Sequence, residues 1–170
     1  MSTAVWSTLD TPIGPFTAVV ADGAVIASGW TAELAELMPQ VHPSIRPAEL
    51  VAGDLGPVAD AITRYHAGDL SAIDGVPVRQ RSGAFLEHAW DVLRQIPAGA
   101  PVTYSEYAAK SGRPAAIRAA ASACARNAAA LFVPCHRVLG SDGGLGGFRW
   151  GTPVKRWLLD HEAEHAPIAG

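Results

Sequence analysis

The sequence is poor in cysteine, in charge and in long apolar runs. It holds 2 cysteines in 170 residues, and 17% of its residues are charged. Cys124 and Cys135 are too few for a disulfide framework or for a cysteine-based zinc site. No apolar run approaches the roughly 20 residues that a membrane-spanning helix needs, and the opening residues lack the features of a secretory signal. We therefore expect reduced thiols in a cytoplasmic protein without a membrane partner.

The sequence does contain enough apolar material for a sizeable core. Hydrophobic residues make up 49% of the chain, which argues against general disorder. Charge is unevenly distributed: residues 1–82 hold four arginines against nine acidic residues, whereas residues 94–156 hold nine Lys or Arg against only Glu106 and Asp142. The basic stretch is compatible with a polyanion-binding face or with an ordinary solvated surface.

The first part of the chain predicts a small α+β unit in which no chemistry is visible. We expect strands over residues 5–9, 16–21, 24–29 and 71–78, and helices over 31–37 and 57–66. Asp22-Gly23 between two of these strands is a hairpin signal. The pattern changes after Arg81, so we place a domain boundary near residue 80. The two domains are then 1–80 and 81–170.

The second part predicts helices, over residues 82–96, 104–110 and 114–126 and from Thr152 onward. Ser82 can cap the first of them, and Pro114 suits the first position of the third. The short turn around Gly112 gives two of these helices the shape of a helix-turn-helix. The last helix is expected to bury a stripe made of Val154, Trp157, Leu158 and His161.

A cysteine and a histidine are neighbours at Cys135-His136. A thiolate is the attacking form of cysteine, and a histidine can take up the thiol proton, so the pair supplies a nucleophile and a base. The plainer interpretation is a buried cysteine on a strand, with His136 in an incidental hydrogen bond. Adjacent residues need not face each other, so the pair alone leaves both interpretations open.

The surrounding sequence resembles the O6-alkylguanine-DNA alkyltransferases, the methylated-DNA–protein-cysteine methyltransferases. Pro-Cys-His-Arg-Val stands at residues 134–138, after Asn127 and before Gly-Gly-Phe-Arg-Trp-Gly at 146–151, and the likeness is close over residues 82–164. It implies an α+β fold in which a small ribonuclease H-like domain, structural in role, precedes a mostly helical, winged helix-turn-helix-like domain that binds DNA and carries the alkyl transfer. It also implies that O6-alkylguanine is flipped out of duplex DNA and dealkylated irreversibly, in a single turnover without a cofactor.

The resemblance gives five residues catalytic roles. Cys135 accepts the alkyl group, His136 takes its proton through a water, and Glu162 orients that histidine. Asn127 supports the active-site turn, and Tyr104 donates a hydrogen bond to the guanine N3. Glu162 could instead be a solvated residue near a helix end, and Tyr104 a core aromatic.

The resemblance also implies a DNA-binding surface and a substrate pocket. Arg118 would fill the gap left by the flipped base, or would simply contact a phosphate. Small alanines would let their helix approach the minor groove, although alanine also favours helices on its own account. The other DNA-contact candidates are Thr103, Arg113, Ala115, Ala116, Ala119, Ala120, Arg126, Lys155 and Arg156, and the pocket candidates are Arg137, Val138, Gly146 and Phe148.

Departures from the family and two rival functions stay open. Residues 1–82 hold no cysteine, so the zinc site of some relatives is not expected. Phe148 stands where tyrosine is frequent, and Ile117 where alanine is common. The rivals are a non-catalytic alkyltransferase-like protein, which would lack the acceptor Cys135, and a cysteine hydrolase of unrelated fold. The expected partner is double-stranded DNA containing O6-alkylguanine, read with little sequence preference by a monomer.

Overall fold

The computed structural model describes residues 2–167 and has a mixed α+β fold. The chain divides into two compact units. One comprises Met1–Ser82 with Ala128–Phe132, and the other comprises Gly83–Asn127 and the chain from Val133 onward. Across residues 2–167, no helix combines the length and the apolar character needed to cross a membrane.

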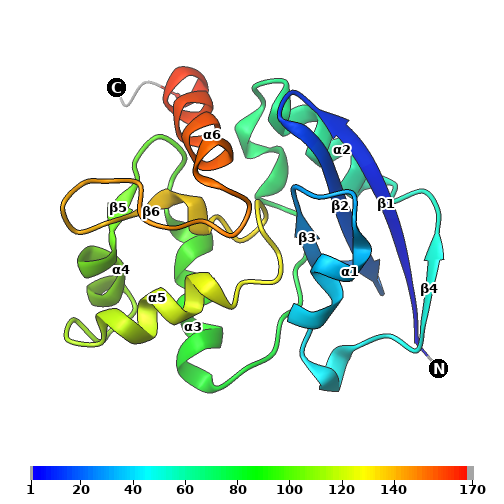
Figure 1. Cartoon of the computed structure of the whole chain (residues 1–170), viewed down its shortest axis with the longest axis horizontal. Coiled ribbons are helices and arrows are strands. Elements are labelled where there is room, and N and C mark those ends of the chain that lie inside the picture. Colours follow the sequence, from blue (N-terminus) through cyan, green and yellow to red (C-terminus); the bar gives the residue numbers. More distant parts are fainter. Residues whose placement is uncertain (1, 168–170) are drawn as a thin grey trace. The chain divides into compact units, whose positions relative to one another are not determined.

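A four-stranded sheet in the order β3-β2-β1-β4 forms the centre of the N-terminal unit (Figure 1). Strands β1 (Thr3–Thr11), β2 (Gly14–Ala21) and β3 (Ala24–Gly29) are antiparallel neighbours, which confirms three of the predicted strands. Asp22 and Gly23 both have positive φ, as a two-residue hairpin turn requires. Strand β4 (Glu49–Ala52) pairs in parallel with β1. It was not predicted because its four residues are all exposed and carry no apolar alternation.

The helices of this unit correct two predictions. Helix α2 (Pro57–His66) is as expected, but α1 (Leu34–Leu37) is shorter than the helix predicted over 31–37. The reason is that the Thr31 hydroxyl accepts a 3.0 Å hydrogen bond from the Glu33 amide and holds a turn there. The strand predicted over 71–78 is wrong. A 3₁₀ turn, Leu70–Ile73, occupies its first three residues, and Val78 alone bridges to Val25.

Residues Ala128–Phe132 belong to the N-terminal unit although they follow its sequence by almost fifty positions. The amide and hydroxyl of Ser28 donate to the carbonyls of Ala128 and Ala130 at 2.9 and 2.7 Å. The ring of Phe132 also lies edge-on to that of Phe16, with centroids 6.4 Å apart. The five residues that end two positions before Pro134 are therefore anchored on the sheet.

Four helices and a two-stranded parallel sheet make up the C-terminal unit (Figure 1). Side-chain hydrogen bonds to backbone carbonyls connect three of these helices. Trp90 Nε1 on α3 donates to the Ala123 carbonyl on α5 at 2.8 Å, and the Tyr107 hydroxyl on α4 donates to the Ala89 carbonyl on α3 at 2.7 Å. The elements are α3 (Ala84–Gln95), β5 (Val102–Thr103), α4 (Tyr104–Lys110), α5 (Ile117–Ala125), β6 (Val138–Leu139) and α6 (Thr152–His165).

The predicted helix starts need correction at three places. Helix α3 starts at Ala84 after Gly83, without the Ser82 cap. Helix α5 starts at Ile117, because the Ala116 amide bonds the Arg113 carbonyl and closes a separate turn around Pro114. Helix α6 includes Thr152 as its first residue. Helix α4 begins as predicted, because Thr103 and Glu106 form a reciprocal capping box.

Candidate active site

Cys135 begins a short 3₁₀ turn, Cys135–Arg137, that leads directly into β6. The turn is held from α5, since the amide nitrogen of Asn127 donates a 2.8 Å hydrogen bond to the Val133 carbonyl. This is the contact expected of a residue that supports the turn. Cys135 is buried, so its thiol is largely withdrawn from water. The alternative of a cysteine within a strand does not match this local structure.

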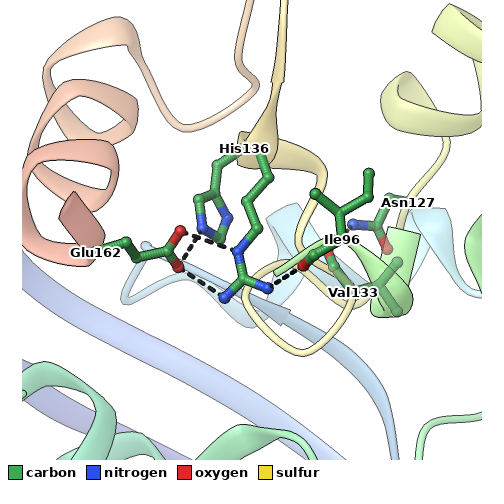
Figure 2. A network of polar contacts seen from close by, with 6 residues as sticks. Ile96, Asn127, Val133, His136 and Glu162 are labelled. Carbon is green, nitrogen blue, oxygen red and sulfur yellow. Dashed lines mark hydrogen bonds and ion pairs between the residues drawn. The ribbon is translucent and has the colours of Figure 1, made fainter. Parts of the chain in front are cut away.

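The two residues that follow the cysteine, His136 and Arg137, form a buried network with Glu162 (Figure 2). Nε2 of His136 lies 2.8 Å from Oε2 of Glu162. The Arg137 guanidinium donates from Nε and Nη2 to the two oxygens of the same carboxylate, both at 2.9 Å, and from Nη1 to the Ile96 carbonyl at 2.7 Å. Glu162 is 1% exposed, so it is not the solvated residue of the plainer interpretation. The Arg137 guanidinium holds Glu162, in place of the pocket role implied by the resemblance.

The network fixes the charge states that a base needs. Burial opposes ionisation of Glu162, but the hydrogen bond from His136 and the hydrogen bonds and positive charge of Arg137 outweigh it and hold the pKa of this carboxyl well below its usual range. Burial also lowers the pKa of His136, against the opposing pull of the Glu162 charge. The imidazole is therefore neutral at neutral pH and able to accept a proton. Among residues 2–167, nothing hydrogen-bonds Nδ1 of His136, although this atom is buried.

Two groups counteract the burial of the Cys135 thiol. Burial raises the pKa of this thiol, whereas a hydrogen bond from the Asn127 side chain and the charge of Lys155 lower it. Lys155 is itself 1% exposed, and its Nζ donates to the Val138 carbonyl at 2.7 Å and to the Gly147 carbonyl at 3.4 Å. The prediction that Lys155 contacts phosphate is therefore wrong. The buried residues of α6 are Lys155, Leu158, His161 and Glu162, so the predicted stripe is shifted.

The sequence contained a signal for Lys155 that was missed. Positions 155, 158 and 162 follow the i, i+3, i+7 spacing of one helix face, and two of the three carry charge. A charged residue on a buried stripe needs a polar partner from elsewhere in the fold. Here the partners are the Val138 carbonyl for Lys155 and His136 with Arg137 for Glu162.

Tyr104 and the glycine-rich loop after β6 lie against each other beside the cysteine. Tyr104 is half-buried at the start of α4, and burial together with the nearby Cys124 and Cys135 raises its pKa to about 12. Gly146 has φ +69°, and a Cβ there would stand 3.5 Å from Cε2 of Tyr104 and 4.0 Å from Nζ of Lys155. The loop backbone thus comes within van der Waals distance of the tyrosine. Val138 is fully buried, and Phe148 is half-buried at the far end of the loop.

The second cysteine, Cys124, lies on α5 and is electrostatically coupled to Cys135 and Lys155. Burial raises the pKa of the Cys124 thiol well above its usual value, and the neighbouring Cys135 adds to this effect. The thiolate of Cys124 is therefore disfavoured. Cys124 is only partly enclosed, but its charge state supports the interpretation of a packing residue. Within residues 2–167, no three His, Cys, Asp or Glu side chains gather as a metal site requires.

The DNA-contact candidates are distributed over the surface and the interior. Arg113, Arg118 and Arg126 are exposed, and the guanidinium carbon of Arg113 lies 4.8 Å from the ring centroid of Phe85. The Thr103 hydroxyl is engaged as the cap of α4. Ala116 and Ala119 are half-buried and Ala115 is exposed, but Ala120 is fully buried, so the prediction that Ala120 faces the minor groove is wrong.

A pocket of about 530 Å³ lies in the same unit but away from the cysteine. Its walls come from the end of α3, the following loop and α4, and neither Cys135 nor Tyr104 lines it. Its one link to the network is Ile96, whose carbonyl accepts the hydrogen bond from Arg137.

Comparisons with known proteins find relatives in both sequence and fold. Residues 84–164 match the family model for the DNA-binding domain of 6-O-methylguanine DNA methyltransferase. The methylated-DNA–protein-cysteine methyltransferase of Mycobacterium tuberculosis is 35% identical over 162 residues, which cover 95% of this chain and 94% of that protein. The chain belongs to the methylated-DNA–protein-cysteine methyltransferase family.

A solved structure and a longer relative extend the comparison. The crystal structure of the Mycobacterium tuberculosis OGT in complex with DNA matches with a TM-score of 0.79 and 30% identity, over 96% of each chain. The bifunctional transcriptional activator/DNA repair enzyme Ada of Escherichia coli is 48% identical over 90 residues, or 53% of this chain. The matched segment spans 25% of Ada's own length.

Proposed function

We propose that this methyltransferase-family protein repairs O6-alkylguanine in duplex DNA by moving the alkyl group irreversibly to Cys135. The observation that carries the proposal is the Cys135 turn, in which the cysteine is followed in the chain by a neutral histidine that hydrogen-bonds a buried carboxylate. The sulfur attacks the alkyl carbon, a carbon–sulfur bond forms, and the bond from carbon to O6 breaks with its electron pair going to guanine. The thiol proton ends on the departing base. The thioether product is not reversed, so each molecule acts once.

The proton path leads from the Cys135 thiol to Nδ1 of His136. Because Glu162 is ionised and accepts, Nε2 carries the hydrogen of this neutral imidazole, and Nδ1 keeps its lone pair. Nδ1 is also the buried nitrogen without a hydrogen bond among the described residues. It is therefore the acceptor for the Cys135 proton, relayed through a water. Glu162 fixes the tautomer and stabilises the imidazolium, in the way that the acid of a catalytic triad does.

Tyr104 acts as a hydrogen-bond donor to the departing guanine. With a pKa raised to about 12, its phenol stays protonated throughout the physiological range. A donor aimed at N3 stabilises the negative charge that grows on the base as the alkyl group leaves. The backbone of the loop at Gly146, with Val138 and Phe148, forms the wall against which the guanine lies.

DNA is the partner that the family match and the DNA complex of the relative support. Helix α5 enters the minor groove, Arg118 fills the gap in the base stack, and Arg113 and Arg126 contact phosphates. The unit made of Gly83–Asn127 and the chain from Val133 onward is the winged helix-turn-helix-like reaction domain. Met1–Ser82 with Ala128–Phe132 form the ribonuclease H-like structural domain, so the boundary expected near residue 80 is crossed by one later segment. A monomeric state and a cytoplasmic location complete the proposal.

Mass spectrometry tests the proposal directly. The protein is incubated with a duplex that carries one O6-methylguanine, and the peptides are then analysed for a gain of one CH₂. We expect the gain on Cys135 in the wild type and in Cys124→Ala, and no gain in Cys135→Ala, which still binds the duplex. Methylation on Cys124 contradicts the assignment. Duplex binding without transfer favours the alkyltransferase-like rival, and neither binding nor transfer favours a hydrolase.

A further inference from the structure

Ile117 is an exposed apolar side chain at the point where α5 begins. Three large apolar residues within 2–167 are exposed: Leu50 and Val51 on β4 of the N-terminal unit, and Ile117, which is 39% exposed, in the C-terminal unit. Ile117 immediately precedes Arg118 in the first turn of the helix. Consecutive helical residues differ by 1.5 Å along the axis, so both side chains project from the same end of α5.

The other exposed residues of α5 have short side chains, so Ile117 and Arg118 project farther from the helix than their neighbours. Ala120 and Ala123 are fully buried against the unit. The other side of the helix carries Ala121, Ser122 and Ala125, which are exposed or half-buried and have no long side chain. The helix also contains no acidic residue. A polyanion can therefore approach this side closely, and only Ile117 and Arg118 would reach into it.

The fold gives no reason for isoleucine at this position. A single exposed apolar residue is ordinary on a protein surface. However, isoleucine is a poorer helix former than alanine, and 39% of Ile117 stays exposed in the free protein. A residue that disfavours its own helix and stays in water is better explained by a surface that covers it on binding.

We infer that Ile117 is an apolar wedge that packs against the deoxyribose and base edges of the minor groove beside the flipped nucleotide. This inference rests on the proposed function, in which α5 enters that groove. Minor-groove proteins bend DNA by pressing isoleucine, leucine or phenylalanine against or between base steps. Arg118 then fills the gap that the flipped nucleotide leaves in the base stack, while Ile117 holds the adjacent base step open. Contacts of both residues thus offset part of the free energy of unstacking.

The test compares Ile117→Ala with variants that keep the apolar reach. On a duplex that carries O6-methylguanine beside 2-aminopurine, Ile117→Ala should bind roughly three- to tenfold more weakly and give a smaller rise in 2-aminopurine fluorescence. Its single-turnover rate on the duplex should fall relative to its rate on free O6-benzylguanine, which needs no flipping. Ile117→Leu should restore both duplex properties, whereas Ile117→Asn should not.

Salt dependence separates a wedge from a charge contact. An apolar contact displaces no counterions, so the slope of log affinity against log salt should be the same in Ile117→Ala as in the wild type. Val51→Ala, a similarly exposed apolar residue on β4, is the matched control and should leave all readouts unchanged.

Two results overturn the inference. One is unaltered duplex binding and fluorescence in Ile117→Ala, and the other is an equal loss of rate on duplex and free base, which would indicate an effect through the fold. A wild type that methylates Cys135 while Ile117→Ala behaves normally refutes the wedge but leaves the proposed function intact. A wild type that takes up no methyl group refutes both.

Discussion

Nζ of Lys155 donates a 2.7 Å hydrogen bond to the carbonyl oxygen of Val138, two residues beyond His136. The ammonium is buried on α6, and its charge acts on the Cys135 thiol. Burial lowers the pKa of Lys155, while negative charge on Cys135 or Cys124 raises it. One side chain therefore both braces the strand that leaves the active-site turn and favours the thiolate.

Removal of the ammonium should weaken the nucleophile. Lys155→Met keeps the length of the side chain but loses the charge that lowers the pKa of Cys135, so that pKa should rise. The pH dependence of alkylation by iodoacetamide in a Cys124→Ala background measures it. Arg156→Ala is the control, since Arg156 is exposed next to Lys155 and should leave the profile unchanged. An unshifted profile in Lys155→Met would show that the lysine has only a structural role.

Glu162→Gln should destabilise the fold most strongly at neutral pH. The variant leaves the buried Arg137 without its carboxylate, which costs about 3–5 kcal/mol. The folded-state pKa of Glu162 lies well below the ordinary value of about 4.3, so its contribution is complete above that pH and is lost as the pH falls toward the folded-state pKa. Urea unfolding at pH 7 and near pH 3 measures the free energy of unfolding of both proteins. The difference in this free energy between wild type and variant should be smaller near pH 3 than at pH 7. A difference in the free energy of unfolding that grows in acid contradicts the assignment of Glu162 as an ionised carboxylate.

Arg118→Ala should separate base flipping from chemistry. Flipping costs a few kcal/mol of unstacking and unpairing, which an inserted side chain partly offsets, whereas free benzylguanine carries no such cost. We expect the duplex rate to fall and the free-base rate to stay near that of the wild type. Arg118→Lys should restore little, because an ammonium is strongly hydrated and lacks a planar stacking group. An equal loss on both substrates would mean that Arg118 acts through the pocket or the fold.

Phe85 should matter for DNA affinity through Arg113. The Phe85 ring lies beneath the exposed Arg113 guanidinium, and such a contact is worth about 0.5–1 kcal/mol. Phe85→Leu should therefore weaken duplex binding about two- to fivefold, and Phe85→Tyr should not. Arg113→Ala should reduce the slope of log affinity against log salt concentration by about 1. In the Arg113→Ala background, Phe85→Leu should not weaken duplex binding any further. If the losses of binding free energy add up in the double variant, Phe85 and Arg113 act separately on DNA affinity.

The sequence by itself determined the local features of this protein. Apolar alternation and the Asp22-Gly23 turn predicted three strands of the sheet, and the spacing around α2 predicted its helix. Pro-Cys-His-Arg-Val at residues 134–138, together with Asn127 and the segment 146–151, identified the family, which the comparisons confirm. These features depend on residues that are close in the chain, so short-range patterns suffice to encode them.

Only the tertiary structure decided which charged residues are buried and which distant segment packs on the N-terminal sheet. Lys155 and Glu162 are buried because Val138, His136 and Arg137, between 17 and 26 positions away, satisfy their polar atoms. Ala128–Phe132 joins the N-terminal sheet because Ser28 offers hydrogen-bond donors to its carbonyls. A buried charge or an unpaired carbonyl is tolerated only when a distant residue supplies its partner. Local periodicity carries no information about that partner, so the three-dimensional fold had to determine it.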